Sequence, residues 1–218
     1  MRFLLVGFCV SLLAEAQSGP VIRLFPVDDT ARDSAFRSYV GKLRSAVDGR
    51  KTDALRKLVD KDVVVGPENE DKGWTKFVER WRPDDRENSP VWKGLSDLLS
   101  LGFIQEHPSL FLSPYLVWRF PDNLSMSGHL VAVKDKVEVR ERPSPNSRPV
   151  ATLVFDVVRQ LGELQGGEEL VQWIPVQTLD GKSGYVNARD VMSPLMPRAQ
   201  FGKQRGKWIL IALEGPEQ

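Results

Sequence analysis

The chain has almost no cysteine: among its 218 residues, Cys9 is the single example. It lies in an apolar stretch near the N-terminus, so the sequence from Gln17 onward contains no thiol. That part of the chain can form no disulfide, supply no thiolate nucleophile and offer no sulfur ligand to a metal. These absences exclude a cysteine-dependent endopeptidase.

Long apolar runs are also absent after the first sixteen residues. Met1-Arg2 is a short basic start, Phe3 to Leu13 is apolar apart from Gly7 and Ser11, and Ala14-Glu15-Ala16 supplies small residues for cleavage. This pattern is typical of a secretory signal peptide at 1–16, and the apolar run is shorter than a membrane span of about 20 residues. A buried N-terminal strand is the alternative. We therefore expect an exported protein, periplasmic or extracellular, with no membrane insertion after the signal is removed.

Histidine and excess charge are scarce as well. The two histidines, His107 and His129, lie far apart without the spacing of a zinc motif, so we expect no metal site. The 30 basic and 29 acidic residues give a net charge of +1, which argues against a nucleic-acid partner. No G-x-S-x-G, S-x-x-K or phosphate-loop motif occurs, and we expect no cofactor.

The first half of the chain shows helical periodicity from Asp28 to about residue 102. Apolar residues recur at three- and four-residue steps in four segments: Phe36 to Val47, Leu55 to Val59, Trp74 to Trp81, and Trp92 to Leu101. Thr52 is a candidate cap for the second segment, and Ser89-Pro90 for the fourth. A brief strand is expected at 62–66. The proline-containing segment 103–128 is expected to be irregular and packed on the helices.

After His129 the period changes to two. Short apolar-polar alternations are separated by turn residues such as Pro143 to Ser147, Gly166-Gly167 and Asp180-Gly181. This spacing predicts a small antiparallel β-barrel. The tail at 196–218 predicts one further hairpin, in which Trp208 needs a buried face. Whether that hairpin joins the barrel or the helices stays open.

Four ordered motifs in this region resemble the bacterial SH3-like (SH3b) domain, over about residues 129–193. They are Val137-Glu138-Val139-Arg140-Glu141-Arg142-Pro143-Ser144, the apolar segment Val150 to Leu153, Trp173-Ile174-Pro175-Val176, and Asp180-Gly181-Lys182-Ser183-Gly184-Tyr185-Val186. Tyr185 stands where the family more often has tryptophan, and Pro175 interrupts the third motif. The tail from Phe201 to Trp208 also resembles the last hairpin of ketosteroid-isomerase-like cones, but that fold needs more strands than the sequence shows.

The prediction is thus an α+β protein with a helical domain at 17–128, a small SH3-like barrel at 129–195 and a C-terminal β-hairpin at 196–218. The SH3-like resemblance implies an aromatic groove that binds a peptide, with Trp173, Tyr185 and Arg140 as candidate ligand-binding residues. Packing within the barrel is the alternative role for Trp173 and Tyr185. Four acidic residues could meet the amines of a peptide or form a solvated rim: Asp135, Glu163, Glu168 and Glu169.

The function expected from these features is non-catalytic. We predict an exported envelope binding protein whose barrel recognises a peptide, with a peptidoglycan stem peptide or an envelope protein as the candidate partner. One alternative is a carboxylate-based cell-wall hydrolase targeted by the barrel, with its acids among Glu68, Glu70, Glu79 and Asp84. Another is a barrel that only braces the helical domain. No residue is assigned a catalytic role.

Overall fold

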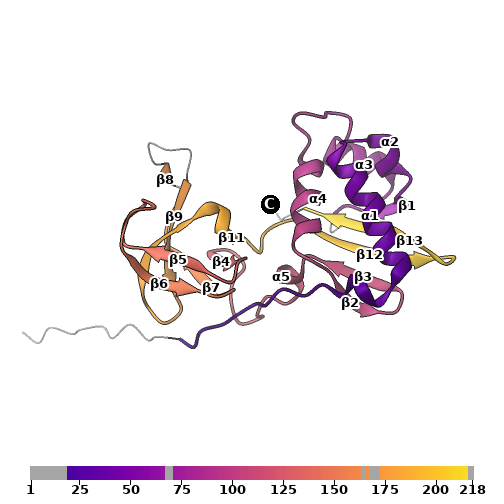
Figure 1. Cartoon of the computed structure of the whole chain (residues 1–218). Helices are drawn as coiled ribbons and strands as arrows, with labels where there is room; N and C mark the ends of the chain where they lie inside the picture. The colour runs from indigo at the N-terminus through magenta and orange to yellow at the C-terminus, as the bar shows by residue number, and fades with distance from the viewer. Residues whose placement is uncertain (1–18, 67–70, 164, 167–171, 216–218) are drawn as a thin grey trace, which may run out of the picture.

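A computed structural model of the protein describes residues 19–66, 71–163, 165–166 and 172–215 (Figure 1). The helices within these ranges are η1 Asp29–Arg32, α1 Ser34–Asp48, α2 Thr52–Arg56, α3 Trp74–Trp81, α4 Pro90–Ser100, α5 Tyr115–Trp118 and η2 Ala188–Asp190. The strands are β1 Val59–Val64, β2 Ile104–His107, β3 Leu110–Ser113, β4 His129–Ala132, β5 Val137–Arg140, β6 Pro149–Leu153, β7 Val157–Gln160, β8 Gln165–Gly166, β9 Gln172–Thr178, β10 Ser183–Asn187, β11 Val191–Met192, β12 Arg198–Gln204 and β13 Lys207–Glu214. The α+β class is confirmed.

The strands form two sheets, one in each of two lobes (Figure 1). The first sheet has the order β1-β13-β12-β3-β2 and, with helices α1 to α5, makes the helical lobe. The second has the order β11-β4-β7-β9-β10-β5-β6, with β8 paired to β9, and makes the β lobe. The β lobe lies in the chain between β3 and β12, which are neighbours in the first sheet. It is therefore an insertion into the helical lobe, and its strand path is open rather than a closed barrel.

Local capping chemistry explains where the predicted helices begin. The Asp33 side chain accepts the Phe36 N–H at 2.8 Å at the start of α1. Ser89 caps α4 and Pro90 follows at the first helical position, as expected. The prediction that Thr52 caps α2 is wrong. Thr52 is the first helical residue, and its hydroxyl donates instead to the Pro83 carbonyl at 2.9 Å.

The expectation of an irregular segment at 103–128 is also wrong. This segment contains β2, β3 and α5, and β3 pairs antiparallel with β12. The region 17–128 is consequently not purely helical, because β1, β2 and β3 supply three strands of the first sheet. The predicted C-terminal hairpin is present as β12 and β13, and it completes this sheet rather than the second one.

Aromatic rings fill the space between α1 and the first sheet. Phe36 stacks on Phe111 with ring centroids 3.8 Å apart and planes inclined by 6°. Phe103, Phe201 and Trp208 approach Phe36 edge-on at 5.3, 5.7 and 5.0 Å. Edge and offset contacts of this kind stabilise a core beyond the area that they bury. The predicted need of Trp208 for a buried face is met here.

A second apolar cluster joins the two lobes. Leu112 from β3 and Leu116 from α5 pack in the same cluster as Val131 from β4 and Val157 from β7. Leu24, from the N-terminal segment that runs beneath both lobes in Figure 1, belongs to it too. The β lobe has in addition its own small core of aliphatic side chains. The lobes are thus packed on each other and not merely linked.

Candidate functional site

The three residues predicted to bind a ligand lie on neighbouring strands of the β lobe. Tyr185 of β10 is directly opposite Arg140 of β5 on one side and Pro175 of β9 on the other. Trp173 of β9 is opposite Asn187 of β10. Because side chains alternate across a sheet, Trp173, Pro175, Tyr185, Asn187 and Arg140 share one face. The register therefore brings the predicted residues together.

This shared face points away from the lobe's core. The intervening residues Ile174, Val176 and Val186 belong to the core cluster, whereas Trp173 and Tyr185 do not. Trp173 is nevertheless only 4% exposed. Neighbouring side chains on the outer face therefore cover most of this ring.

A groove of about 390 Å³ lies over this ring. The residue just before β5 and the β5–β6 hairpin form one wall of the groove. The start of β9 forms the floor. Asn187 and η2 form the other wall. The lining residues are Lys136, Glu138, Arg140, Pro145, Trp173, Asn187 and Asp190. Of the predicted residues, Trp173 and Arg140 line the groove, and Tyr185 lies beside Arg140 without lining it.

The charges of the groove are balanced and mostly paired. Arg140 donates from one guanidinium nitrogen to the Glu138 carboxylate and from the other to the Ser147 carbonyl. Lys134 pairs with Asp190 at the far wall. Lys136 is exposed and has no ion pair among the described residues. Among the residues that the structure describes, the groove thus offers Lys136 as a free cation together with anchored carboxylates.

Asn187 adds a directional hydrogen-bonding group. Its side-chain oxygen accepts the Arg189 N–H at 3.0 Å, which begins η2 and fixes the amide. The amide nitrogen of Asn187 has no partner among the described residues, and it can donate to a ligand carbonyl. Glu138, Asn187 and Asp190 were not predicted. Glu138 could have been found, because it is two residues from Arg140 on the same strand and shares its face.

The other predicted acidic residues lie elsewhere. Asp135 and Glu163 are exposed outside the groove, and Glu168 and Glu169 fall outside the described residues. Of the candidate hydrolase acids, Glu68 and Glu70 also fall outside them. Glu79 is exposed and pairs with Lys76 at 2.9 Å, and Asp84 lines a cleft of the helical lobe. The structure does not bring Glu79 and Asp84 together in that cleft.

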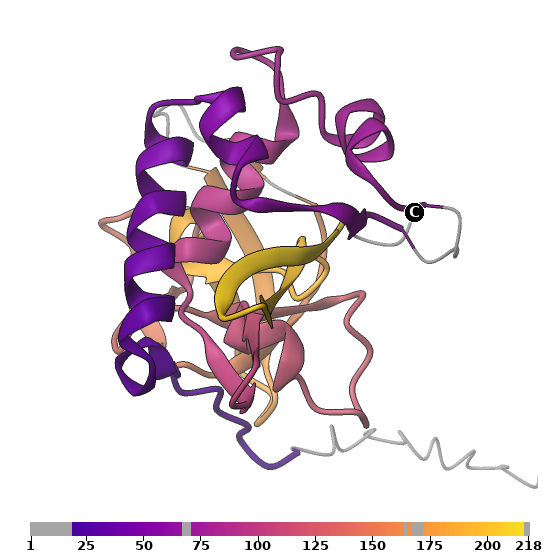
Figure 2. The ribbon, with the colours of Figure 1, turned by 90° about the vertical axis from the view of Figure 1, so that its right-hand side faces the viewer.

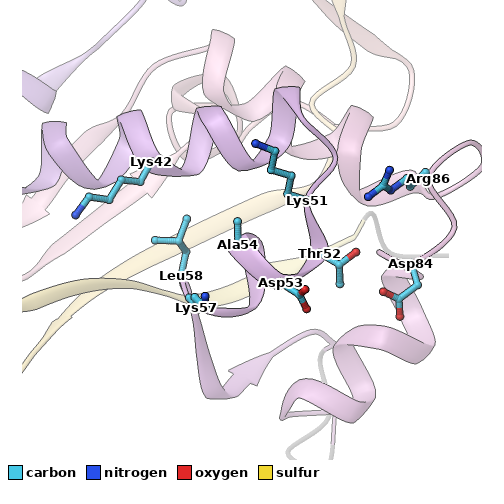
Figure 3. Close-up of a pocket in the computed structure, with 9 residues that line it drawn as sticks. All are labelled: Lys42, Lys51, Thr52, Asp53, Ala54, Lys57, Leu58, Asp84 and Arg86. Atoms are coloured by element: carbon cyan, nitrogen blue, oxygen red, sulfur yellow. The ribbon is translucent and has the colours of Figure 1, made fainter.

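That cleft, of about 720 Å³, lies between α1, α2 and the segment after α3 (Figure 3). Figure 3 shows Lys42, Lys51 and Lys57 on the side of Ala54 and Leu58, and Arg86 with Asp84 at the other end. All four cationic side chains are on the surface. Such groups are strongly hydrated, and the cleft shows none of the buried polar groups that fix a small ligand.

Within the described ranges, no cluster of three or more His, Cys, Asp or Glu side chains is placed to hold a metal ion. No helix in the same ranges is long and apolar enough to cross a bilayer.

In comparisons with known proteins, no family model matches the chain, and no curated protein or solved structure matches it. The SH3-like resemblance therefore rests on the sequence motifs quoted above.

Proposed function

We propose that the β lobe is an SH3-like module that binds an extended peptide in the groove over Trp173, and that the protein is an exported, non-catalytic envelope binding protein. The observation that carries this proposal is the position of Trp173. Its ring lies at the floor of a groove, on the face opposite the core residues Ile174 and Val176. An aromatic floor between a long hairpin and a 3₁₀ turn suits an extended chain.

The chemistry of the lining favours a peptide over a purely apolar or strongly charged ligand. Trp173 and Pro145 supply apolar contact, and the Asn187 amide can donate to a backbone carbonyl. Lys136 can meet a carboxylate, while Glu138 and Asp190 can meet an amine. A short peptide with free amino and carboxyl groups carries each of these complements. A peptidoglycan stem peptide is our first candidate, because the N-terminal sequence predicts export.

A second role is favoured by the cluster between the lobes. Leu116 is fully buried in that cluster with Val131 and Val157 of the β lobe. The β lobe therefore also braces the helical lobe. Bracing and peptide binding use different faces of the β lobe, so one does not exclude the other.

The proposal is tested by co-sedimentation with purified peptidoglycan sacculi, followed by titration of soluble muropeptides. The wild-type chain from Gln17 to Gln218 should bind without releasing fragments. Trp173→Ala should weaken binding at least about tenfold, since truncating a tryptophan hot spot at the centre of an interface costs about 2 kcal/mol or more. Lys136→Glu should weaken binding severalfold without changing the fold.

A control variant separates the loss of the site from a change in net charge. Arg159→Glu makes the same charge change on the exposed part of β7, away from the groove, and should leave binding unchanged. Equal weakening by Arg159→Glu and Lys136→Glu would mean that net charge, not the groove, drives association. Release of soluble fragments would instead establish a wall hydrolase.

A further inference from the structure

The first sheet has a second face, opposite α1, which is only partly covered. Trp208 and Leu210 of β13 point into the core beside α1, which runs along one side of the β12–β13 hairpin in Figure 2. Ile209 and Ile211 alternate with them and therefore point to the opposite face. Next to β2 and β3, that opposite face is covered by α5 through Ile104 and Leu112. Next to β1 and β13 it is open.

A groove of about 1220 Å³ lies on this open part. Its apolar surface comes from Val64, which is 36% exposed, and from the half-buried Ile209 and Ile211. The remaining lining residues belong to the end of α2, to β1 and to the tip of hairpin β12–β13: Arg56, Lys57, Val59, Asp60, Lys61, Asp62, Gln204, Arg205 and Lys207. We call this the β1–β13 groove.

The rim of the β1–β13 groove is basic. Five cationic and two acidic residues line it, and Lys61 is already paired with Asp62 at 2.6 Å. Lys57, Arg205 and Lys207 are exposed, and among the described residues their side chains have no ion pair or hydrogen bond. Asp60 is 7% exposed, and its carboxylate accepts the Asp62 N–H at 2.7 Å. The charge available to a partner is therefore positive.

We propose that the β1–β13 groove binds an extended acidic segment of a partner protein in which apolar and acidic residues alternate. In such a strand, apolar side chains would contact Val64, Ile209 and Ile211, and carboxylates would meet Lys57, Arg205 and Lys207. The alternation follows from the groove itself, which has an apolar floor between basic edges. This site is independent of the peptide groove in the β lobe.

Two other occupants are disfavoured by the same geometry. A second copy of the chain meeting this face by two-fold symmetry would oppose two copies of the same net-positive rim, and like-charged surfaces repel. A bilayer surface would contact the exposed cations, but Ile209 and Ile211 lie half-buried between them. A single extended chain is narrow enough to reach both the exposed cations and the two isoleucines.

The experiment uses the chain from Gln17 to Gln218 and three fluorescein-labelled, end-blocked decapeptides. One alternates glutamate with valine, one glutamine with valine, and one lysine with valine. Fluorescence anisotropy should show binding of the glutamate peptide at least about tenfold tighter than the glutamine peptide, and weakening with added salt. The lysine peptide should not bind.

Paired variants locate the binding. Arg205→Glu with Lys207→Glu should abolish binding of the glutamate peptide, whereas Arg37→Glu with Arg159→Glu, equal in charge and distant from the groove, should leave it within about twofold. Ile209→Ser should weaken binding severalfold. Equal effects of the two charge-reversal pairs, or no preference among the peptides, would overturn the proposal. Binding only to anionic phospholipid vesicles, or dimerisation that Ile209→Ser abolishes, would also overturn it.

Discussion

Asp33 shows how one side chain can serve several parts of this fold. Its carboxylate accepts the Phe36 N–H at the start of α1, and it pairs with Lys203 of β12 at 3.0 Å. The Lys203 ammonium lies 5.3 Å from the centre of the Trp208 ring. Asp33 therefore holds the N-terminal end of α1 next to β12, a strand that α1 covers. These contacts, the backbone N–H of Phe36 first among them, hold the pKa of Asp33 below its ordinary value.

A pH-dependent loss of stability follows from this lowered pKa. A carboxyl group whose pKa is lower in the folded state stabilises the fold above its unfolded pKa of about 3.8, and the contribution is lost as the pH falls toward the folded pKa. Asp33→Asn keeps a capping oxygen but removes the charge. We expect it to lower the free energy of unfolding by about 0.5–1 kcal/mol at neutral pH. That difference should disappear in acid.

Urea unfolding of both proteins across this pH range measures the difference. Asp122→Asn is the matched control, because Asp122 is an exposed acid whose side chain has no hydrogen bond or ion pair among the described residues, and it should show no difference at any pH. A difference for Asp33→Asn that stays constant with pH would contradict the role of its charge.

The candidate groove could be predicted in part from single residues. Trp173 and Arg140 were identifiable because they stand in motifs that resemble the SH3-like family. The register of β9, β10 and β5 then decides which side chains become neighbours, and this register is a tertiary property. Asn187 and Asp190 lie at and just after the end of β10, where nothing in the local sequence indicates that the η2 turn closes a groove.

At the scale of elements, helices were predictable and the middle strands were not. The segments of α1, α3 and α4 have regular apolar spacing, and α1 and α4 also have recognisable caps in Asp33 and Ser89. Strands β2 and β3 are only four residues each, and β3 is apolar through Leu110-Phe111-Leu112, which matches neither a period of two nor one of 3.6. The pairing of β3 with β12 also decides where the tail packs.

The segment before η1 is an element without regular structure that ties the lobes together. The Leu24 N–H donates to the Phe155 carbonyl at 2.8 Å, and the Ile22 carbonyl accepts the Val157 N–H at 2.8 Å. Arg23 pairs with Asp156 at 2.7 Å, and that carboxylate is nearly buried. Residues 22–24 are thus hydrogen-bonded along the β lobe, with an isolated antiparallel bridge between Arg23 and Asp156, before the chain enters the helical lobe.

Removing the Arg23 side chain should loosen this segment. Arg23→Ala leaves the Asp156 carboxylate without its cation, and because Arg23 is itself half-exposed we expect a loss of only about 1 kcal/mol. Hydrogen exchange at the Leu24 amide should accelerate roughly fivefold. Native-state exchange followed by mass spectrometry measures both effects.

Arg32→Ala is the comparison for Arg23→Ala. Arg32 pairs with Asp29 at 2.9 Å within η1, where both partners are more exposed than Arg23 and Asp156. It should change stability by less than about 0.5 kcal/mol and leave the exchange of Leu24 unaltered. Faster exchange at Leu24 in both variants would mean that the segment responds to net charge and not to the Arg23–Asp156 pair.

At the scale of the whole molecule, the chain leaves the helical lobe after α5, forms the β lobe, and returns to complete the first sheet. The pairing of β3 with β12 and the parallel pairing of β1 with β13 both join segments that have the whole β lobe between them in the chain. The junction cluster then covers the remaining apolar surface of both lobes. The two lobes should consequently behave as one cooperative unit.

Leu116→Ala tests this cooperativity, because Leu116 is fully buried at the junction and contributes to neither lobe's separate core cluster. The cavity should cost about 2–5 kcal/mol. Calorimetry of the wild type should show one transition whose calorimetric and van't Hoff enthalpies agree, and the variant should show one transition at lower temperature. Hydrogen exchange in α1 and in β7 should accelerate by the same factor.

Leu153→Ala, in the core of the β lobe alone, should also lower the temperature of that single transition if the lobes unfold together. Two separate transitions, with only one of them moved by Leu153→Ala, would show instead that the β lobe unfolds independently and does not brace the helical lobe.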